Sequence, residues 1–279
     1  MKSNRAVPSL ADAPDELLQT GHLWVFEQVD GAPFRFQMRS SGLLRFGTSD
    51  RVYESAEDVP VEYQHAVRYI TERIDREALR TGVSEPEEIV FFGVATHRHA
   101  IAYDWQRLPS FLGTDIWAPS TEFLTVDRIE QVFETIDLPV INTFAREQHT
   151  RDFDIETYQW PNSAWYDGPP AGVLIRDKTG RQAQVPNPAL ASEQPTPPSE
   201  ITAELAVDRF VTDALLSELT AELDGPVTVD TLRSLAIEAV VRRQYPLLFE
   251  QTAKIDMQAF RSAVGARTQA FLATESGSN

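Results

Sequence analysis

The chain contains no cysteine among its 279 residues, which excludes disulfide bonds, thiolate metal sites and thiol catalysis. No apolar run approaches the roughly 20 residues that a helix needs to cross a bilayer, and the first residues lack the basic-then-apolar pattern of a secretion signal. These absences predict a cytoplasmic protein with no membrane partner. The apolar fraction of 42% is ordinary for a globular protein, so the chain can build a sizeable core.

Lysine is also scarce. Only Lys2, Lys178 and Lys254 are lysines among the 25 basic residues, and all others are arginine. The 42 acidic residues give a formal net charge of −17, which indicates either a basic partner or adaptation to a salt-rich cytoplasm, where ~1 M salt screens repulsion beyond ~3 Å. The acidic residues are spread along the whole chain, which favours the halophilic interpretation. Contacts with phosphate would then depend mostly on arginine.

Residues 1–20 are largely polar and predict a lead-in with one short helix. Two runs rich in aromatic and β-branched residues, 22–29 and 33–38, flank Asp30 and Gly31, a pattern typical of a β-hairpin. Helical spacing follows at 62–79 and again at 126–136. Further strands are expected at 43–47, 87–95, 99–105, 111–117 and 138–144, with a hairpin formed by 171–177 and 181–185.

The pattern changes near residue 187. Residues 187–200 have the composition of a proline-rich linker. Residues 201–223, 228–245 and 256–272 show helical periodicity, with Thr228 or Asp230 and then Asp256 as helix starts. We therefore expect an α+β protein with an antiparallel-sheet body at 21–186 and a C-terminal helical domain at 201–279.

Residues 26–34 read FEQVDGAPF and are followed by SSGLLRFGTSDR. This segment resembles the first motif of covalent nucleotidyltransferases, specifically the RNA ligase family that includes the second class of phage RNA ligases, where the run is Glu–Lys–x–Asp–Gly. EIVFFGVATHRHAIAYDWQRLPSFLGTDIW resembles the third-motif region, and PPAGVLIRDKTGRQAQV resembles the fourth and fifth motifs. The segments keep the family's order and spacing over residues 22–186. The resemblance implies the adenylation-domain fold, and ATP with Mg²⁺ as cofactors if binding is retained.

In that family a lysine amine attacks the α-phosphorus of ATP, and glutamates and late lysines assist. Gln28 stands at the position of the nucleophile, and an amide nitrogen is not a nucleophile at any accessible pH. Val94 and Ala171 stand where the resemblance implies glutamates. The paired late lysines fall on Gln184 and Pro186. No catalytic residue is therefore intact. This pattern is expected of a protein that keeps the fold of the family but has lost its catalytic activity.

Other residues of these motifs do match the family. The resemblance implies that nucleotide would be bound by Glu27, Asp30, Gly31, Arg45, Arg51, Asp115 and Arg176, with Phe111 or Trp117 stacking on adenine. Lys178, on a turn, is a conceivable displaced nucleophile, although near-attack geometry tolerates little displacement. His97 and His99 have the spacing of a metal pair, but no third ligand is evident, so we predict no metal site.

Two classes of function follow. The first is a pseudoenzyme that binds nucleotide or RNA ends, or that partners an active ligase. The alternative is a functional ATP-dependent RNA ligase with displaced catalytic residues, of which one variant would seal only pre-adenylated RNA. A third possibility is a cleft that serves only as a protein-interaction surface. The helical tail fits either an ordinary amphipathic core or a surface for RNA ends or a partner.

Overall fold

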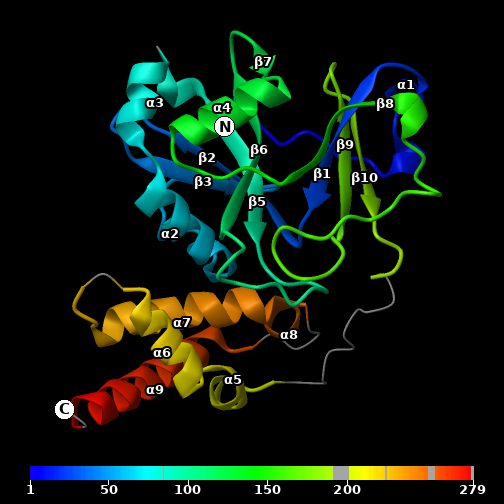
Figure 1. The fold of residues 1–279 in the computed structure, drawn as a ribbon. Helices are drawn as coiled ribbons and strands as arrows, with labels where there is room; N and C mark the ends of the chain where they lie inside the picture. Colours follow the sequence, from blue (N-terminus) through cyan, green and yellow to red (C-terminus); the bar gives the residue numbers. More distant parts are fainter. Residues whose placement is uncertain (84, 191–200, 224, 251–254, 278–279) are drawn as a thin grey trace. The chain divides into compact units, whose positions relative to one another are not determined.

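The computed structural model describes the chain except for residues 84, 191–200, 224, 251–254 and 278–279 (Figure 1). The chain divides into two compact units, one formed by Met1–Thr96 with Ala100–Gln194 and the other by His97–His99 with Pro195–Asn279. Most of the predicted proline-rich linker lies outside the described residues. The polar residues 1–20 belong to the first unit, and they contain the short helix α1 (Glu16–Gln19).

The first unit contains antiparallel strands, as the strand patterns predict, and the structure arranges them in two sheets. One sheet has the strand order β10-β9-β1-β8 and the other has the order β4-β3-β2-β5-β6-β7. The strands are β1 (His22–Gln28), β2 (Gly31–Met38), β3 (Leu44–Thr48), β4 (Val52–Tyr53), β5 (Val90–Thr96), β6 (Phe111–Ala118), β7 (Glu122–Phe123), β8 (Thr143–His149), β9 (Gly172–Asp177) and β10 (Gln182–Pro186). The predicted hairpin of β9 and β10 is confirmed.

The hairpin predicted across Asp30 and Gly31 is wrong. β1 pairs with β8 and β9, whereas β2 pairs with β3 and β5, so the two strands enter different sheets. Gly31 has a φ of +150°, and a Cβ there would lie 2.4 Å from the carbonyl oxygen of Ala95. The Asp–Gly pair therefore allows β2 to leave β1 and approach the backbone of β5 closely.

Three other expectations need correction. The helix predicted at 62–79 is divided into α2 (Gln64–Arg73) and α3 (Arg76–Gly82), because the Asp75 side chain accepts a hydrogen bond from Ala78 N and starts a new helix. Residues 99–105 form no strand, since the amides of Ala100 and Ile101 donate to the Asp30 carboxylate instead of a sheet partner. The strand predicted at 138–144 begins only at Thr143.

The second unit is helical, as predicted, and contains α5 (Ala203–Phe210), α6 (Asp213–Ala221), α7 (Val229–Arg243), α8 (Tyr245–Phe249) and α9 (Met257–Gly277). The pattern at 201–223 is divided because Thr212 caps a second helix through Leu215 N. Thr228 caps α7 in the same way, and Asp256 accepts hydrogen bonds just before α9. α9 packs against α5 and α7, which gives the amphipathic faces their core.

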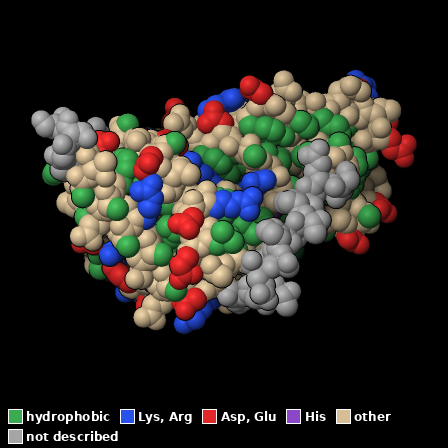
Figure 2. All heavy atoms as spheres, turned by 90° about the horizontal axis from the view of Figure 1, so that it is seen from below, with side chains coloured by type: hydrophobic (Ala, Val, Ile, Leu, Met, Phe, Trp, Pro, Cys, Tyr) green, Lys and Arg blue, Asp and Glu red, His purple; other side chains and the backbone are tan. Residues whose placement is uncertain are grey.

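Acidic side chains are distributed over the molecular face drawn in Figure 2, and basic ones lie among them. This distribution agrees with the even spread of acidic residues along the sequence. None of the helices in the described part of the chain is long and apolar enough to span a bilayer.

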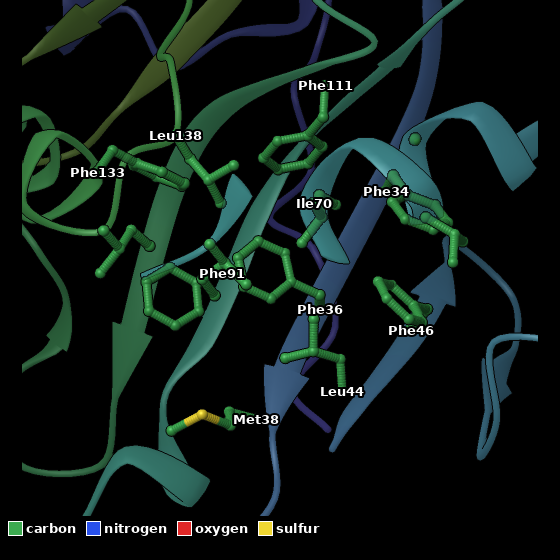
Figure 3. Packing of buried hydrophobic residues seen from close by; sticks show 14 of the residues in the cluster. Phe34, Phe36, Met38, Leu44, Phe46, Ile70, Phe91, Phe111, Phe133 and Leu138 are labelled. Carbon is green, nitrogen blue, oxygen red and sulfur yellow. The ribbon is translucent and has the colours of Figure 1, made fainter. Parts of the chain in front are cut away.

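The main core lies on one face of the six-stranded sheet, where α2, α3 and α4 (Val126–Thr135) cover it (Figure 1). Phenylalanines dominate this cluster, as Figure 3 shows, and they come from β2, β3, β5, β6 and α4. Phe36 and Phe91 stack with ring centroids 4.8 Å apart, and Phe133 meets Phe91 edge-on at 5.8 Å. This packing fixes the strands of the six-stranded sheet, whose other face contributes to a cavity.

Candidate functional site

A cavity of about 540 Å³ lies where β1 and β2 diverge into the two sheets. Its apolar wall is formed mainly by Val29, Phe92, Val94, Ile141 and Leu174. Its polar wall includes Glu27, Gln28, Thr114, Asp115, Arg176, Gln182 and Gln184, together with Ser3, Asn4 and Arg5 from the start of the chain. Volumes of 300–1,000 Å³ with mixed linings are usual for small-molecule sites. The cavity is therefore the candidate site.

Gln28, at the end of β1, is bonded to a second glutamine. Its Nε2 donates to Gln184 Oε1 at 3.3 Å, across the intervening strand β9. The contact between Gln28 and Gln184 requires a glycine at 172, because a Cβ at that position would lie 2.5 Å from Gln28 Oε1. Two positions that the resemblance assigns to lysines are thus occupied by neutral amides in mutual contact.

Glu27 is buried and engaged within the protein. One carboxylate oxygen accepts from Asn142 Nδ2 at 2.9 Å and from Ala164 N at 3.1 Å, and the other accepts from the hydroxyl of Ser163. These bonds tie β1 to the segments that follow α4 and β8. A carboxylate satisfied in this way stabilises the wall and has little capacity left for a ligand.

Asp115 and Arg176 form a buried ion pair at 2.7 Å. The guanidinium of Arg176 also donates to Gln182 Oε1 at 2.9 Å, so it joins β9, β10 and β6. A register shift between Phe92 and Gly93 in the β5–β6 pairing leaves Thr114 as an extra residue, and both Thr114 and Asp115 then line the cavity.

Arg5 brings a second guanidinium to the cavity. It donates to Gly180 O at 3.0 Å and lies 3.8 Å from Asp115. Burial lowers the pKa of Arg5 from its ordinary value, which Asp115 opposes, and arginine stays charged at neutral pH in any case. The formal charges of Arg5, Arg176, Glu27 and Asp115 therefore cancel in the lining.

Several residues predicted for nucleotide binding lie outside the lining. Asp30 accepts from Ala100 N and Ile101 N and so anchors the segment that follows β5. Arg45 bonds to Gln37, the Arg51 guanidinium lies 5.3 Å from the Tyr53 ring, and Phe111 is fully buried in the main core. Trp117 and Ala171 are also absent from the lining, whereas Glu27, Gln28, Gly31, Val94, Asp115, Arg176 and Gln184 are brought together there.

Lys178 is remote from Gln28. Gln28 pairs with Gly172 on β9, and Lys178 follows six residues later. At about 3.3 Å per strand residue the two positions are roughly 20 Å apart. Lys178 instead contacts Glu147 at 2.8 Å. This geometry does not favour Lys178 as a displaced nucleophile at the cavity.

Sequence reasoning missed Phe92, Gln182 and Arg5. The adjacent Phe91 and Phe92 carried a signal, because successive strand residues face opposite sides and one of the two had to face away from the main core. Gln182 and Arg5 carried no such signal, since their roles depend on residues far away in the sequence.

The carboxylates of the cavity do not fit a divalent cation. Glu27 already accepts from three donors, and Asp115 Oδ2 is paired with Arg176. Asp115 Oδ1 lies 3.8 Å from the cationic Arg5. Among the described residues there is no group of three or more acidic or histidine side chains arranged to hold a metal ion.

No family model and no curated protein matches the chain by sequence. Solved structures do match. A variant of RNA ligase from Naegleria gruberi with ATP and Mn aligns with a TM-score of 0.51 at 12% identity, covering 67% of this chain and 57% of that one. The fold is that of RNA ligases. Another Naegleria variant with ATP and Mn gives 0.50 at 13% identity, covering 67% and 56%. An archaeal ATP-dependent RNA ligase gives 0.46 at 13% identity, covering 96% of this chain and 63% of its own.

This chain therefore spans less than two thirds of the length of these RNA ligases. At such low identity the likeness extends to the fold alone. The α+β architecture with antiparallel sheets and C-terminal helices agrees with the expectation from the sequence motifs. The function of the cavity is therefore inferred from the residues that line it.

Proposed function

We propose that the cavity binds an adenine nucleotide, or the 5′-phosphorylated end of an RNA, without transferring AMP to the protein. The observation that carries the proposal is the hydrogen bond between Gln28 and Gln184. Both positions correspond to lysines in the motifs that the chain resembles, and neither amide can act as a nucleophile or neutralise phosphate. On this proposal the cavity binds its ligand but forms no covalent bond with it.

The binding half of the proposal is supported by the size and lining of the cavity. Its apolar wall, which includes Phe92, Val94 and Leu174, suits a planar base, and its polar wall offers amides and guanidinium groups. Solved structures of similar fold contain ATP and Mn. Mg²⁺ would enter only with the phosphates of ATP, because Glu27 already accepts from three donors and Asp115 faces the guanidinium groups of Arg176 and Arg5.

The charge of the lining predicts the ligand preference. Since the four ionised side chains cancel, additional phosphates gain little attraction. We expect AMP and ATP to bind with dissociation constants within about threefold of each other, a difference below about 1 kcal/mol.

Titration calorimetry with AMP and ATP tests binding, and incubation with α-labelled ATP followed by denaturation tests transfer. We expect saturable binding and no label on the protein. Label that survives denaturation would instead support an RNA ligase with displaced residues, and absence of binding at low and high salt would refute the binding claim. Val94→Trp, which fills the cavity, should abolish binding, whereas Leu43→Trp on the exposed surface should leave it unchanged.

A further inference from the structure

Residues 3–9 are here called the N-terminal strap, and residues 3–7 of it form part of the cavity wall. On one side β10 holds the backbone of the strap. Gln182 Nε2 donates to Ala6 O at 3.2 Å, Gln184 Nε2 donates to Val7 O at 3.2 Å, and Gln184 N donates to Pro8 O at 2.9 Å. The strap therefore binds β10 as an added extended segment, a mode by which sheets often bind peptides.

On the other side the strap contacts the six-stranded sheet. The buried Arg35 of β2 donates to Asn4 Oδ1 at 2.9 Å. The Arg5 guanidinium lies 3.7 Å from the centroid of the Phe123 ring and 3.8 Å from Asp115 on β6. The strap thus connects both sheets across the space between them.

Arg5 lines a second cavity as well, together with Arg176. Besides the cavity beside Gln28, a second one of about 390 Å³ is lined by Trp24, Phe123 and Lys178, and Arg5 and Arg176 line both. Arg176 is fixed by its buried ion pair with Asp115, whereas Arg5 is carried by the strap. Release of the strap would withdraw Arg5 from the wall that the two cavities share and leave Arg176 in it.

We propose that the strap selects the ligand by size, an inference that rests on the proposed function. With the strap bound, the cavity admits a mononucleotide and excludes an RNA end. With the strap released, the space that residues 3–7 and the Arg5 side chain occupied becomes free, and the enlarged cavity admits several nucleotides.

The glutamines explain why the strap binds here. Gln184 links the strap to the cavity floor, because it accepts from Gln28 and donates to Val7 O. A lysine at 184 would bring a third cation into a lining that already contains Arg5 and Arg176. A strap on the same chain is also present at high effective concentration, so modest contacts suffice to close the site.

The first test uses Arg5→Ala in the full chain, with AMP and a 5′-phosphorylated RNA oligonucleotide as ligands at one salt concentration. We expect the ratio of the dissociation constant for the RNA to that for AMP to fall at least about tenfold, because loss of the Arg5 charge affects both ligands whereas loss of its bulk favours only the RNA. Arg68→Ala on the exposed face of α2 is the matched control for loss of an arginine and should alter neither dissociation constant. An unchanged or raised ratio in Arg5→Ala would show that Arg5 does not restrict the size of the ligand and would overturn the proposal.

The second test needs no nucleotide and uses the absence of cysteine. Val94→Cys places a single thiol in the cavity wall, and Ser41→Cys places one on an exposed turn. A bulky maleimide should react with Cys at position 94 at least about tenfold faster when Arg5→Ala is added, whereas a small maleimide and the exposed control should be unaffected.

Equal rates for the bulky reagent with and without Arg5→Ala would overturn the strap as a size selector. If the thiol rates respond as expected but no variant binds AMP, ATP or RNA, the proposed function fails and the steric role of the strap stands. The two failures are therefore distinguishable.

Discussion

At the residue scale, Gln28 is held by specific neighbours. Its amide donates to Gln184, and Gly172 provides the space for this contact across β9. The same glutamine at 184 binds the N-terminal strap. Gln28 is thus part of a connected set of polar contacts, and a lysine introduced at this position would disturb the amide pair.

We expect Gln28→Lys to remain unable to form a covalent bond with AMP. The restored amine would lack carboxylates at Val94 and Ala171 and a cation at Gln184, each of which the resemblance implies for the chemistry. Loss of the Gln28–Gln184 bond should also reduce the free energy of unfolding by about 1 kcal/mol. Gel analysis after incubation with α-labelled ATP checks the first effect, and urea unfolding beside Gln28→Ala checks the second. Stoichiometric labelling of Gln28→Lys would contradict the interpretation of several accumulated losses.

At the scale of elements, the divergence of β1 and β2 creates the cavity. Gly31 is the residue on which that divergence depends, because a Cβ would lie 2.4 Å from Ala95 O and 2.6 Å from a methyl group of Val94. Backbone atoms cannot rotate away as a flexible side chain can, so β2 or β5 would have to shift.

We expect Gly31→Ala to destabilise the first unit by about 2–3 kcal/mol and to weaken AMP binding. Gly82→Ala is the matched control, since no atom lies within 4 Å of a Cβ at the end of α3, and its stability should be unchanged or slightly raised. Urea unfolding followed by tryptophan fluorescence reports on the first unit, where all five tryptophans lie. A Gly31→Ala protein as stable as Gly82→Ala would refute the steric argument.

The segment His97–His99 belongs to the helical unit. Arg98 N donates to Arg242 O at 2.9 Å, His97 stacks on Tyr245 with ring centroids 3.8 Å apart, and His99 Nδ1 lies 2.8 Å from Glu250. The pair that sequence spacing offered as possible metal ligands is thus engaged with helical residues. Burial, with smaller contributions from His99 and Arg242, lowers the pKa of His97 to about 3.

The pKa of His97 predicts a loss of stability in acid. An unfolded histidine has a pKa of about 6.5, so between that value and about 3 the unfolded chain binds more protons than the folded one. The contribution is fully present above about pH 6.5 and falls by up to about 1.4 kcal/mol per unit below it. We expect His97→Gln to flatten this dependence and His22→Gln, at an exposed strand end, to retain it, as measured by denaturant unfolding of the helical circular dichroism signal. An unchanged slope in His97→Gln would contradict the assignment.

At the scale of the whole molecule, the net charge of −17 predicts dependence on salt. Acidic residues repel one another over about 10 Å at 0.1 M salt and only about 3 Å at 1 M. We expect the thermal unfolding midpoint to rise as KCl increases from about 0.1 M to about 2 M, because screening removes repulsion from the folded state. Scanning calorimetry in KCl and in an uncharged osmolyte of equal osmolality separates the screening of charge repulsion from the exclusion of the solute from the protein surface. A midpoint that is flat in KCl would count against halophilic adaptation.

The sequence by itself determined most of the strands and helices, because period-2 and period-3.6 patterns of apolar residues record which face of each element is buried. It failed at residues 99–105, where the Asp30 carboxylate takes the backbone amides that a strand would use. The motif resemblance also predicts that Gln28, Val94, Ala171 and Gln184 occupy the positions of chemical residues. The sequence did not determine which strands pair with each other, because the pattern of a buried face does not specify the neighbouring strand. Only the tertiary structure therefore separated β1 from β2 and opened the cavity between their sheets. It alone also placed the N-terminal strap, whose polar residues have no period and bind partners more than 170 positions away.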